Sequence, residues 1–172
     1  MATSTYTSAA DDAATIRSTL KREHGWTSRQ VSVRAENFSL GSAVNVIVRD
    51  PAIPLPVVKA VAEDFERIRR CEVTGEILGG GNRYVSVKYS DEAQQIIGRR
   101  YADAVQRAVN QIEGASLIPV DGTDFLVGEP SNGVGAGGCI TLWDAHGAGC
   151  LSRHWDVDSV ALNIGILSVA RT

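Results

Sequence analysis

Three segments of the chain alternate strictly between apolar and polar residues, and this pattern constrains the fold more than any other feature. A period of two with many β-branched residues is typical of strands that bury one face. The first two segments are separated only by a short turn containing Gly41, which predicts an antiparallel hairpin. The segments are residues 30–36, 43–49 and 83–89, with Val31, Val33, Ala35, Val44, Val46, Val48, Val85 and Val87 on the buried side.

Segments with helical periodicity surround these strands. A first helix is expected to begin at Ser8 and to end near Gly25, because serine and glycine are the usual capping residues at these ends. A second is expected to start near Pro56, and a third to run from Ser90 to about Ile112. The second helix has an apolar stripe of Val57, Val58, Val61, Ala62, Phe65 and Ile68. The order helix–strand–strand–helix–strand–helix predicts an α+β protein with an antiparallel sheet.

The character of the sequence changes after residue 115. Short strands are predicted at Leu117–Val120, Phe125–Val127 and Cys139–Trp143, and Gly133–Gly138 reads as a loop without a phosphate-binding fingerprint. Val160–Val169 is apolar on all sides, which is compatible with a central strand or a buried helix. We therefore expect an α+β core domain over residues 1–115 and a β-rich C-terminal extension over 116–172, packed on the same core.

Charge is distributed unevenly along the chain. The 172 residues carry 17 basic and 20 acidic side chains, a net charge of −3, which gives no general attraction to nucleic acid or anionic membranes. Residues 116–172 hold two arginines against six carboxylates, so the basic side chains belong to the first 115 residues. Three cysteines, no secretion signal and no membrane-spanning apolar run predict a cytosolic protein without a membrane partner.

A family resemblance covers about residues 14–89. The stretches TIRSTLKREH at 15–24 and VSVRAENFSLGSAVNVIVRD at 31–50, followed by the helix with Phe65, resemble a large polyvalent protein associated domain of phages and other mobile elements. The motif is a pattern of strand residues with Phe38, Ser39 and Gly41. The resemblance implies an accessory protein of a mobile element, acting in the host cell against defence systems or with nucleic acid, and it implies no catalytic residues.

The polar face of the three strands is the first candidate site. It is expected to gather Ser32, Arg34, Asn45, Arg49, Tyr84, Ser86 and Lys88. Arginine and lysine contact phosphates and an exposed aromatic ring stacks on bases, so Arg34, Arg49, Tyr84 and Lys88 are candidate binding residues for nucleic acid or a partner. A solvated face, or a face covered by the C-terminal strands, remains an alternative at this point.

The C-terminal segment offers two further candidates. It contains Cys139, Asp144, His146, Cys150, His154, Asp156 and Asp158. Cys150 and His154 are spaced to reach one zinc ion, but the other spacings match no common zinc motif, and buried cysteines are the alternative. A Cys–His nucleophile pair is also conceivable. Trp143 and Trp155 would either anchor a protein interface or fill the local core.

Three functions follow from these observations. The leading hypothesis is a non-enzymatic accessory protein that binds a host protein and inhibits a defence system, with no cofactor. The first alternative is a nucleic-acid-binding module that uses the basic sheet face. The second alternative is a small metal- or thiol-dependent enzyme. Self-association is compatible with each of the three.

Overall fold

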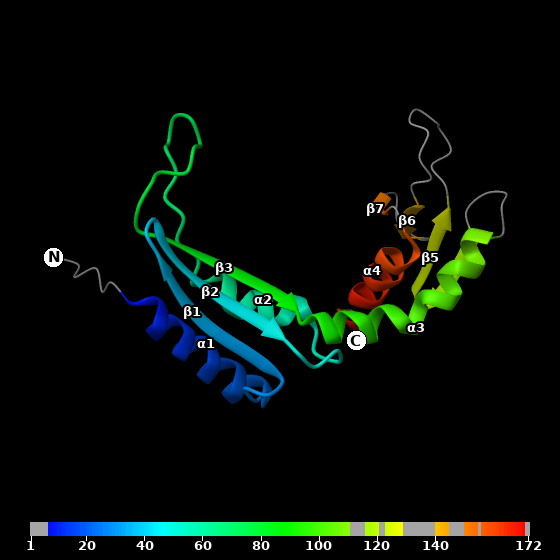
Figure 1. Ribbon diagram of the computed structural model, residues 1–172, viewed down its shortest axis with the longest axis horizontal. Coiled ribbons are helices and arrows are strands. Elements are labelled where there is room, and N and C mark those ends of the chain that lie inside the picture. The colour runs from blue at the N-terminus through cyan, green and yellow to red at the C-terminus, as the bar shows by residue number, and fades with distance from the viewer. Residues whose placement is uncertain are drawn as a thin grey trace. The chain divides into compact units, whose positions relative to one another are not determined.

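The chain forms two compact units in a computed structural model, Met1–Ser90 and Asp91–Thr172 (Figure 1). The structure describes residues 7–110, 116–120, 123–128, 140–144, 150–154 and 156–170. Its helices and two sheets confirm the expected α+β class. The division lies after Ser90, whereas the sequence placed a boundary at residue 115, so the third helix belongs to the second unit.

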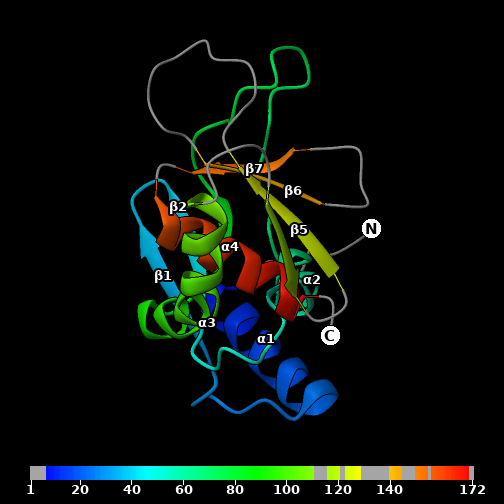
Figure 2. The ribbon, with the colours of Figure 1, turned by 90° about the vertical axis from the view of Figure 1, so that its right-hand side faces the viewer.

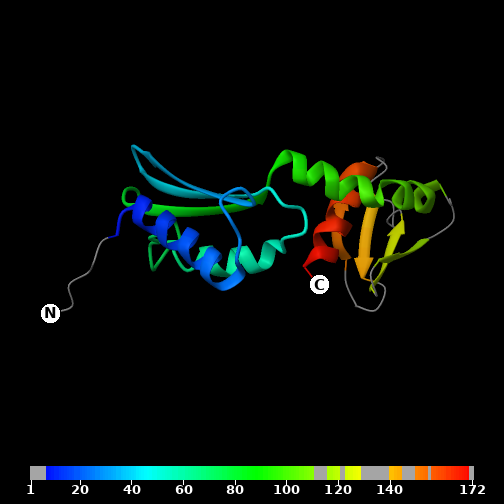
Figure 3. The same ribbon diagram turned by 90° about the horizontal axis from the view of Figure 1, so that it is seen from below.

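The first unit contains two helices and a three-stranded sheet. Its elements are α1 (Ala9–His24), β1 (Val31–Phe38), β2 (Gly41–Val48), α2 (Leu55–Glu63) and β3 (Asn82–Tyr89). The strands lie in the order β1-β2-β3, and both helices pack on one face of the sheet (Figure 3). The other face is therefore left open within this unit, among its described residues.

The ends of α1 are those that the sequence predicts. The hydroxyl of Ser8 accepts a hydrogen bond from the Asp11 N–H, and the Asp11 carboxylate accepts one from the Ser8 N–H, which forms a capping box. The Ser8 hydroxyl and N–H also hold the pKa of Asp11 below its usual value. Gly25 ends the helix with a φ of 71°, a left-handed conformation that favours glycine.

The core of the first unit consists of the inward side chains of the strands and helices. Tyr89 closes one end of this core: its hydroxyl donates to the Ile53 carbonyl oxygen at 2.6 Å, and burial raises its pKa. This bond satisfies the one polar atom of a buried ring. The buried apolar residues include Ile16, Leu20, Val31, Val33, Val44, Val46, Val48, Ile53, Val58 and Ala62.

The sheet is mixed, so the expectation of an antiparallel sheet is wrong for one of its two pairings. β1 and β2 form the predicted antiparallel hairpin, with Val33 opposite Val46. β2 and β3 are parallel, with Val46 opposite Val87. The reason is the connection through α2, which carries the chain back to the end of the sheet where β2 began, as a crossover between parallel strands requires.

α2 is shorter than its apolar periodicity predicts, because it ends at Glu63. The following residues form an arm, residues 67–81, that extends from the end of the sheet where the β1–β2 turn lies (Figure 1).

Arg67 exchanges two backbone hydrogen bonds with Arg83, at 2.9 and 2.8 Å. The buried Asn82 side chain accepts from the Arg69 N–H and donates to the Leu78 carbonyl. The long-range bonds of Arg67 and Arg69 to β3 replace the helical turns expected through Ile68.

The second unit pairs two helices with a four-stranded antiparallel sheet (Figure 2). Its elements are α3 (Asp91–Asn110), β4 (Ser116–Val120), β5 (Thr123–Gly128), β6 (Ile140–Asp144), β7 (Cys150–His154) and α4 (Val157–Val169). The three predicted strands are confirmed and β7 was not expected. The apolar segment at the C-terminus is a buried helix, with Asp156 as its N-cap. The predicted loop Gly133–Gly138 lies outside the described residues.

The core of the second unit lies between its helices and its sheet. α3 packs against β4 and β5, and α4 against β6 and β7. The two helices approach closely at Gly165 of α4, where a Cβ would overlap Cγ2 of Ile97 on α3. The hydroxyl of Tyr101 donates to that of Ser168 at 3.1 Å near this crossing. The buried core residues are Val105, Ile118, Leu142, Val160, Ala161 and Ile164.

Candidate nucleic-acid interface

The open face of the first sheet carries the polar residues that the alternation predicts. The strand register places them in four cross-strand rows, because side chains at paired positions share a face. We call this surface the open face. Its rows are Ser32–Ile47–Lys88, Arg34–Asn45–Ser86, Glu36–Ala43–Tyr84 and Phe38–Gly41–Asn82, with Arg49 continuing β2 beyond the first row.

One end of the open face carries two aromatic side chains. The rings of Phe38 and Tyr84 are stacked, with centroids 6.2 Å apart and an interplanar angle of 26°. Phe38 is 44% exposed and Tyr84 is half-buried, so both rings remain accessible. The backbones of β2 and β3 approach so closely at this end that only glycine fits at position 41, because a Cβ there would lie 2.5 Å from the Asn82 carbonyl oxygen.

The other end of the open face is basic. Arg34, Arg49 and Lys88 are exposed, and among the described residues none of the three forms an ion pair. The Arg49 N–H donates to the Gln30 carbonyl at 2.7 Å, which extends the hairpin register and fixes the backbone of Arg49 beside β1. The one carboxylate on the face, Glu36, accepts a hydrogen bond from the Asn45 amide at 3.2 Å. The open face therefore carries three exposed cations and one carboxylate, and Asp50 follows Arg49 at its basic end.

The sequence predicted the basic residues of this face but not its second aromatic ring. A turn was expected from Asn37 to Ser42, whereas β1 runs through Phe38 and β2 begins at Gly41. Continuing the alternation from Arg34 through Glu36 to Phe38 would have assigned Phe38 to the same face.

Arg83, a further basic residue of β3, lies on the opposite, buried face. Its guanidinium forms an ion pair with Asp12 of α1, donates to the Ser42 hydroxyl at 3.3 Å and donates to the Thr7 carbonyl at 2.9 Å. Both side chains of the pair are almost fully buried. Arg83 thus joins α1 to the sheet and does not belong to the open face.

Most candidate side chains of the C-terminal segment lie outside the residues that the structure describes. Trp143 is on β6, and Cys150 and His154 are at the two ends of β7, but the structure does not describe their side chains. Three further candidates lie wholly outside the described residues: Cys139, His146 and Trp155. Their predicted roles stay predictions. Within the described residues, no group of three or more His, Cys, Asp or Glu side chains is placed to hold a metal ion.

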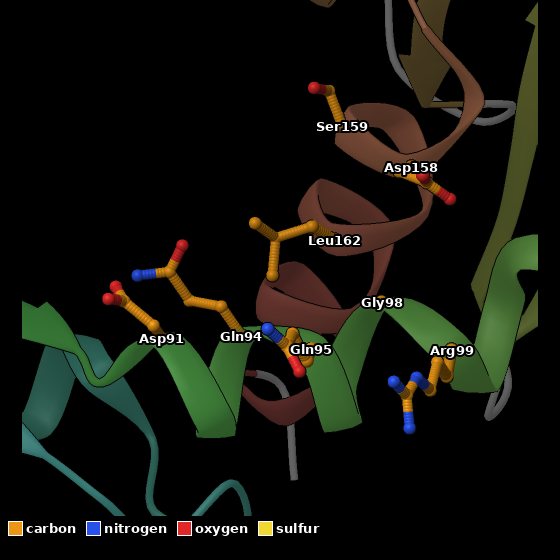
Figure 4. Close-up of a pocket in the computed structure, with 8 residues that line it drawn as sticks. All are labelled: Asp91, Gln94, Gln95, Gly98, Arg99, Asp158, Ser159 and Leu162. Carbon is orange, nitrogen blue, oxygen red and sulfur yellow. The ribbon is translucent and has the colours of Figure 1, made fainter.

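A pocket of about 460 Å³ lies between α3 and α4 in the second unit (Figure 4). Its walls are Asp91, Gln94, Gln95, Gly98 and Arg99 from α3 and Asp158, Ser159 and Leu162 from α4. Asp91, Arg99 and Asp158 are exposed, and Ser159 already donates its N–H and its hydroxyl to the Asp156 carboxylate. The pocket therefore has no buried reactive group and does not resemble a catalytic centre.

Comparison of the chain with protein-family models, with curated proteins and with solved structures finds no match. The resemblance to a large polyvalent protein associated domain therefore stays a prediction. Among the helices in the described part of the chain, none is both long and apolar enough to cross a membrane.

Proposed function

We propose that the first unit binds single-stranded nucleic acid on the open face. The observation that carries this proposal is the presence of the stacked Phe38 and Tyr84 rings and three exposed cations on the same sheet face, which has no covering element in the described part of its unit. Unstacked bases can stack on exposed aromatic rings, while arginine and lysine contact the phosphates. The flat sheet presents both kinds of group on one surface.

The charge of the first unit supports this function better than the charge of the whole chain. Residues 1–90 carry 12 basic and 10 acidic side chains, whereas residues 91–172 carry 5 basic and 10 acidic ones. The net charge of −3 thus conceals a first unit of +2. Because charge acts over about 10 Å at ordinary ionic strength, the local balance governs phosphate binding.

The test is fluorescence anisotropy with labelled single-stranded DNA and RNA and with a duplex of the same sequence. We expect the single strands to bind more tightly, with an affinity that falls as salt rises. Phe38→Ala and Tyr84→Ala should each weaken binding about 5- to 150-fold, the range of one base–aromatic stack. Arg34→Glu with Lys88→Glu should weaken it and reduce its salt dependence.

The matched control is Lys59→Glu, a charge reversal at an exposed position of α2 outside the open face. It should leave the affinity within about twofold of wild type, because its charge is screened from the strand. Equal loss in Lys59→Glu and Arg34→Glu would mean that net charge and not the open face determines binding. No binding at low salt would refute the proposal.

A host-protein partner is the second candidate, and one observation favours it. Apolar side chains are exposed at the end of the first unit, where Leu40 is 67% and Val73 is 92% accessible and Ile77 of the arm is 47% accessible. Exposed apolar groups gathered at one end commonly mark a protein interface. The test is cross-linking in host extract, performed with wild type and with a double variant that carries Leu40→Asp and Val73→Asp. Wild type should capture an identified partner protein, and the double variant should not.

A further inference from the structure

A pocket of about 380 Å³ lies between α1 and the turn that precedes β1. Its floor is apolar and consists of the buried Leu20 of α1 and Val31 of β1. Its exposed rim carries Ala14, Arg17, Ser18, Lys21, Thr27 and Ser28. The indole of Trp26 forms one wall, half-buried and stacked on the His24 ring with centroids 4.4 Å apart. The pocket therefore combines a flat aromatic surface with two basic side chains.

The backbone holds Trp26 in this position. Gly25 donates its N–H to the Lys21 carbonyl and Trp26 donates its N–H to the Leu20 carbonyl, the two bonds of a helix-ending motif. The turn beyond is closed by Val31, whose N–H donates to the Thr27 carbonyl at 2.9 Å. These bonds fix the backbone on both sides of Trp26, and the stacked His24 ring orients the indole by covering one of its faces, which reduces the entropy cost of binding on the other face.

The charge around the pocket favours an anion. Arg17 and Lys21 are exposed and, among the described residues, form no ion pair. Of the nearby carboxylates, Glu23 is paired with Arg22 at 2.9 Å. Asp50 accepts hydrogen bonds from the Ala52 N–H and the Gln30 amide, which hold its pKa below the usual value, so it stays negatively charged with its oxygens engaged by these two donors.

The pocket lies on the helix side of β1, the edge strand of the sheet, and the basic end of the open face begins on the other side of the same strand. Gln30, the last residue of the turn, accepts the hydrogen bond from Arg49, and Ser32 two residues later shares a row with Lys88. To reach the Trp26 pocket, a strand lying over Arg49 and Lys88 has to pass around the start of the edge strand β1. The cations of both surfaces belong to one rigid hairpin and the helix beneath it.

We infer that the pocket between α1 and the 26–31 turn is a second nucleotide-binding subsite. In it Trp26 stacks on a base, Arg17 and Lys21 contact the flanking phosphates, and the same single strand continues onto the open face. This inference rests on the proposed function and extends it, because it makes the bound strand longer than the open face alone can hold. Single-strand sites of 4 to about 16 nucleotides are common in proteins that use such surfaces.

The experiment compares thymidine oligonucleotides of about 4 and about 12 nucleotides on the full chain, by fluorescence anisotropy. In wild type the longer strand should bind at least about tenfold more tightly, since it occupies both subsites. Arg17→Glu with Lys21→Glu, and separately Trp26→Leu, should weaken the longer strand about tenfold and leave the shorter strand within about twofold. The two exposed charge reversals do not touch the core, so they keep the test valid if Trp26→Leu unfolds the first unit.

Each outcome separates the inference from the proposed function. The second subsite would be overturned if the Arg17/Lys21 and Trp26 variants both bound the longer strand as tightly as wild type while Phe38→Ala bound it more weakly. The proposal for the open face would then still stand. Loss of both strands to the same degree in the Arg17/Lys21 variant, but not in the Lys59→Glu control, would also overturn it, because one shared site would then explain all binding. Failure of wild type to bind either strand would refute both proposals.

Discussion

At the scale of single residues, the most consequential interaction is one that the sequence did not reveal. Asp12 lies in the segment where the first helix was expected, and Arg83 opens the third alternating segment. The structure buries both and pairs them across the layer between helix and sheet. Asp12 lies 71 positions from Arg83 along the chain, so no local pattern relates them. Long-range pairs of this kind follow only from the three-dimensional fold.

Loss of the Arg83 guanidinium should destabilise the first unit strongly. In Arg83→Met the Asp12 carboxylate stays buried without its ion-pair partner, which costs about 3–5 kcal/mol of unfolding free energy. Chemical denaturation, followed by circular dichroism, measures this loss. Adding Asp12→Leu should recover part of the loss, because it removes the unpaired charge.

The matched control for this prediction is the exposed ion pair between Arg22 and Glu23. Arg22→Met should cost at most about 1 kcal/mol, because solvent screens both charges. If Arg83→Met and Arg22→Met changed stability equally, the buried pair would not hold α1 to the sheet.

At the scale of secondary structure, the sequence predicted the strands and helix ends that follow from local patterns. It missed the features that depend on residues far away in the chain. The alternation located β1, β2, β3 and the basic residues of the open face, and Ser8 and Gly25 located both ends of α1. The length of α2 was overestimated, because the backbone of Arg67 bonds to β3 instead of continuing the helix. The parallel pairing of β3 was missed for a similar reason, since alternation specifies a face but not a strand direction.

Helix packing in the second unit depends on one glycine, and a second glycine provides its control. In Gly165→Ala the new Cβ would overlap Ile97 and lie 3.2 Å from the Ile97 carbonyl oxygen, so α3 and α4 must separate. We expect a loss of about 1–3 kcal/mol, typical of overpacking a core. Thermal and chemical denaturation measure it.

Gly98 lies on α3 in the same helix pair, but a Cβ there would meet its nearest neighbour, Leu162, at an ordinary 3.8 Å. Gly98→Ala should therefore stabilise the second unit by up to about 1 kcal/mol through helix propensity. A loss in Gly98→Ala as large as in Gly165→Ala would contradict the argument from close approach at Gly165.

At the scale of the whole molecule, the division after Ser90 explains why composition misplaced the boundary. Tyr89 ends β3 and Asp91 begins α3, so only Ser90 separates the last strand of the first unit from the first helix of the second, and no glycine- or proline-rich linker marks the change. The visible change in composition comes after α3, where the strands of the second unit begin. The division also separates charge, because the first unit is net basic and the second net acidic.

The first unit should therefore fold and bind without the second. Its core is completed by its own helices, and Ser90 closes it by donating its N–H to the Val48 carbonyl at 2.8 Å. A fragment of residues 1–90 should unfold cooperatively in denaturant and bind the 12-nucleotide strand at least as tightly as the full chain, because removing net negative charge reduces repulsion of phosphate. Circular dichroism and anisotropy measure these two properties. A folded fragment that binds much more weakly than the full chain would show that the second unit contributes to the site, and the open face alone would no longer account for binding.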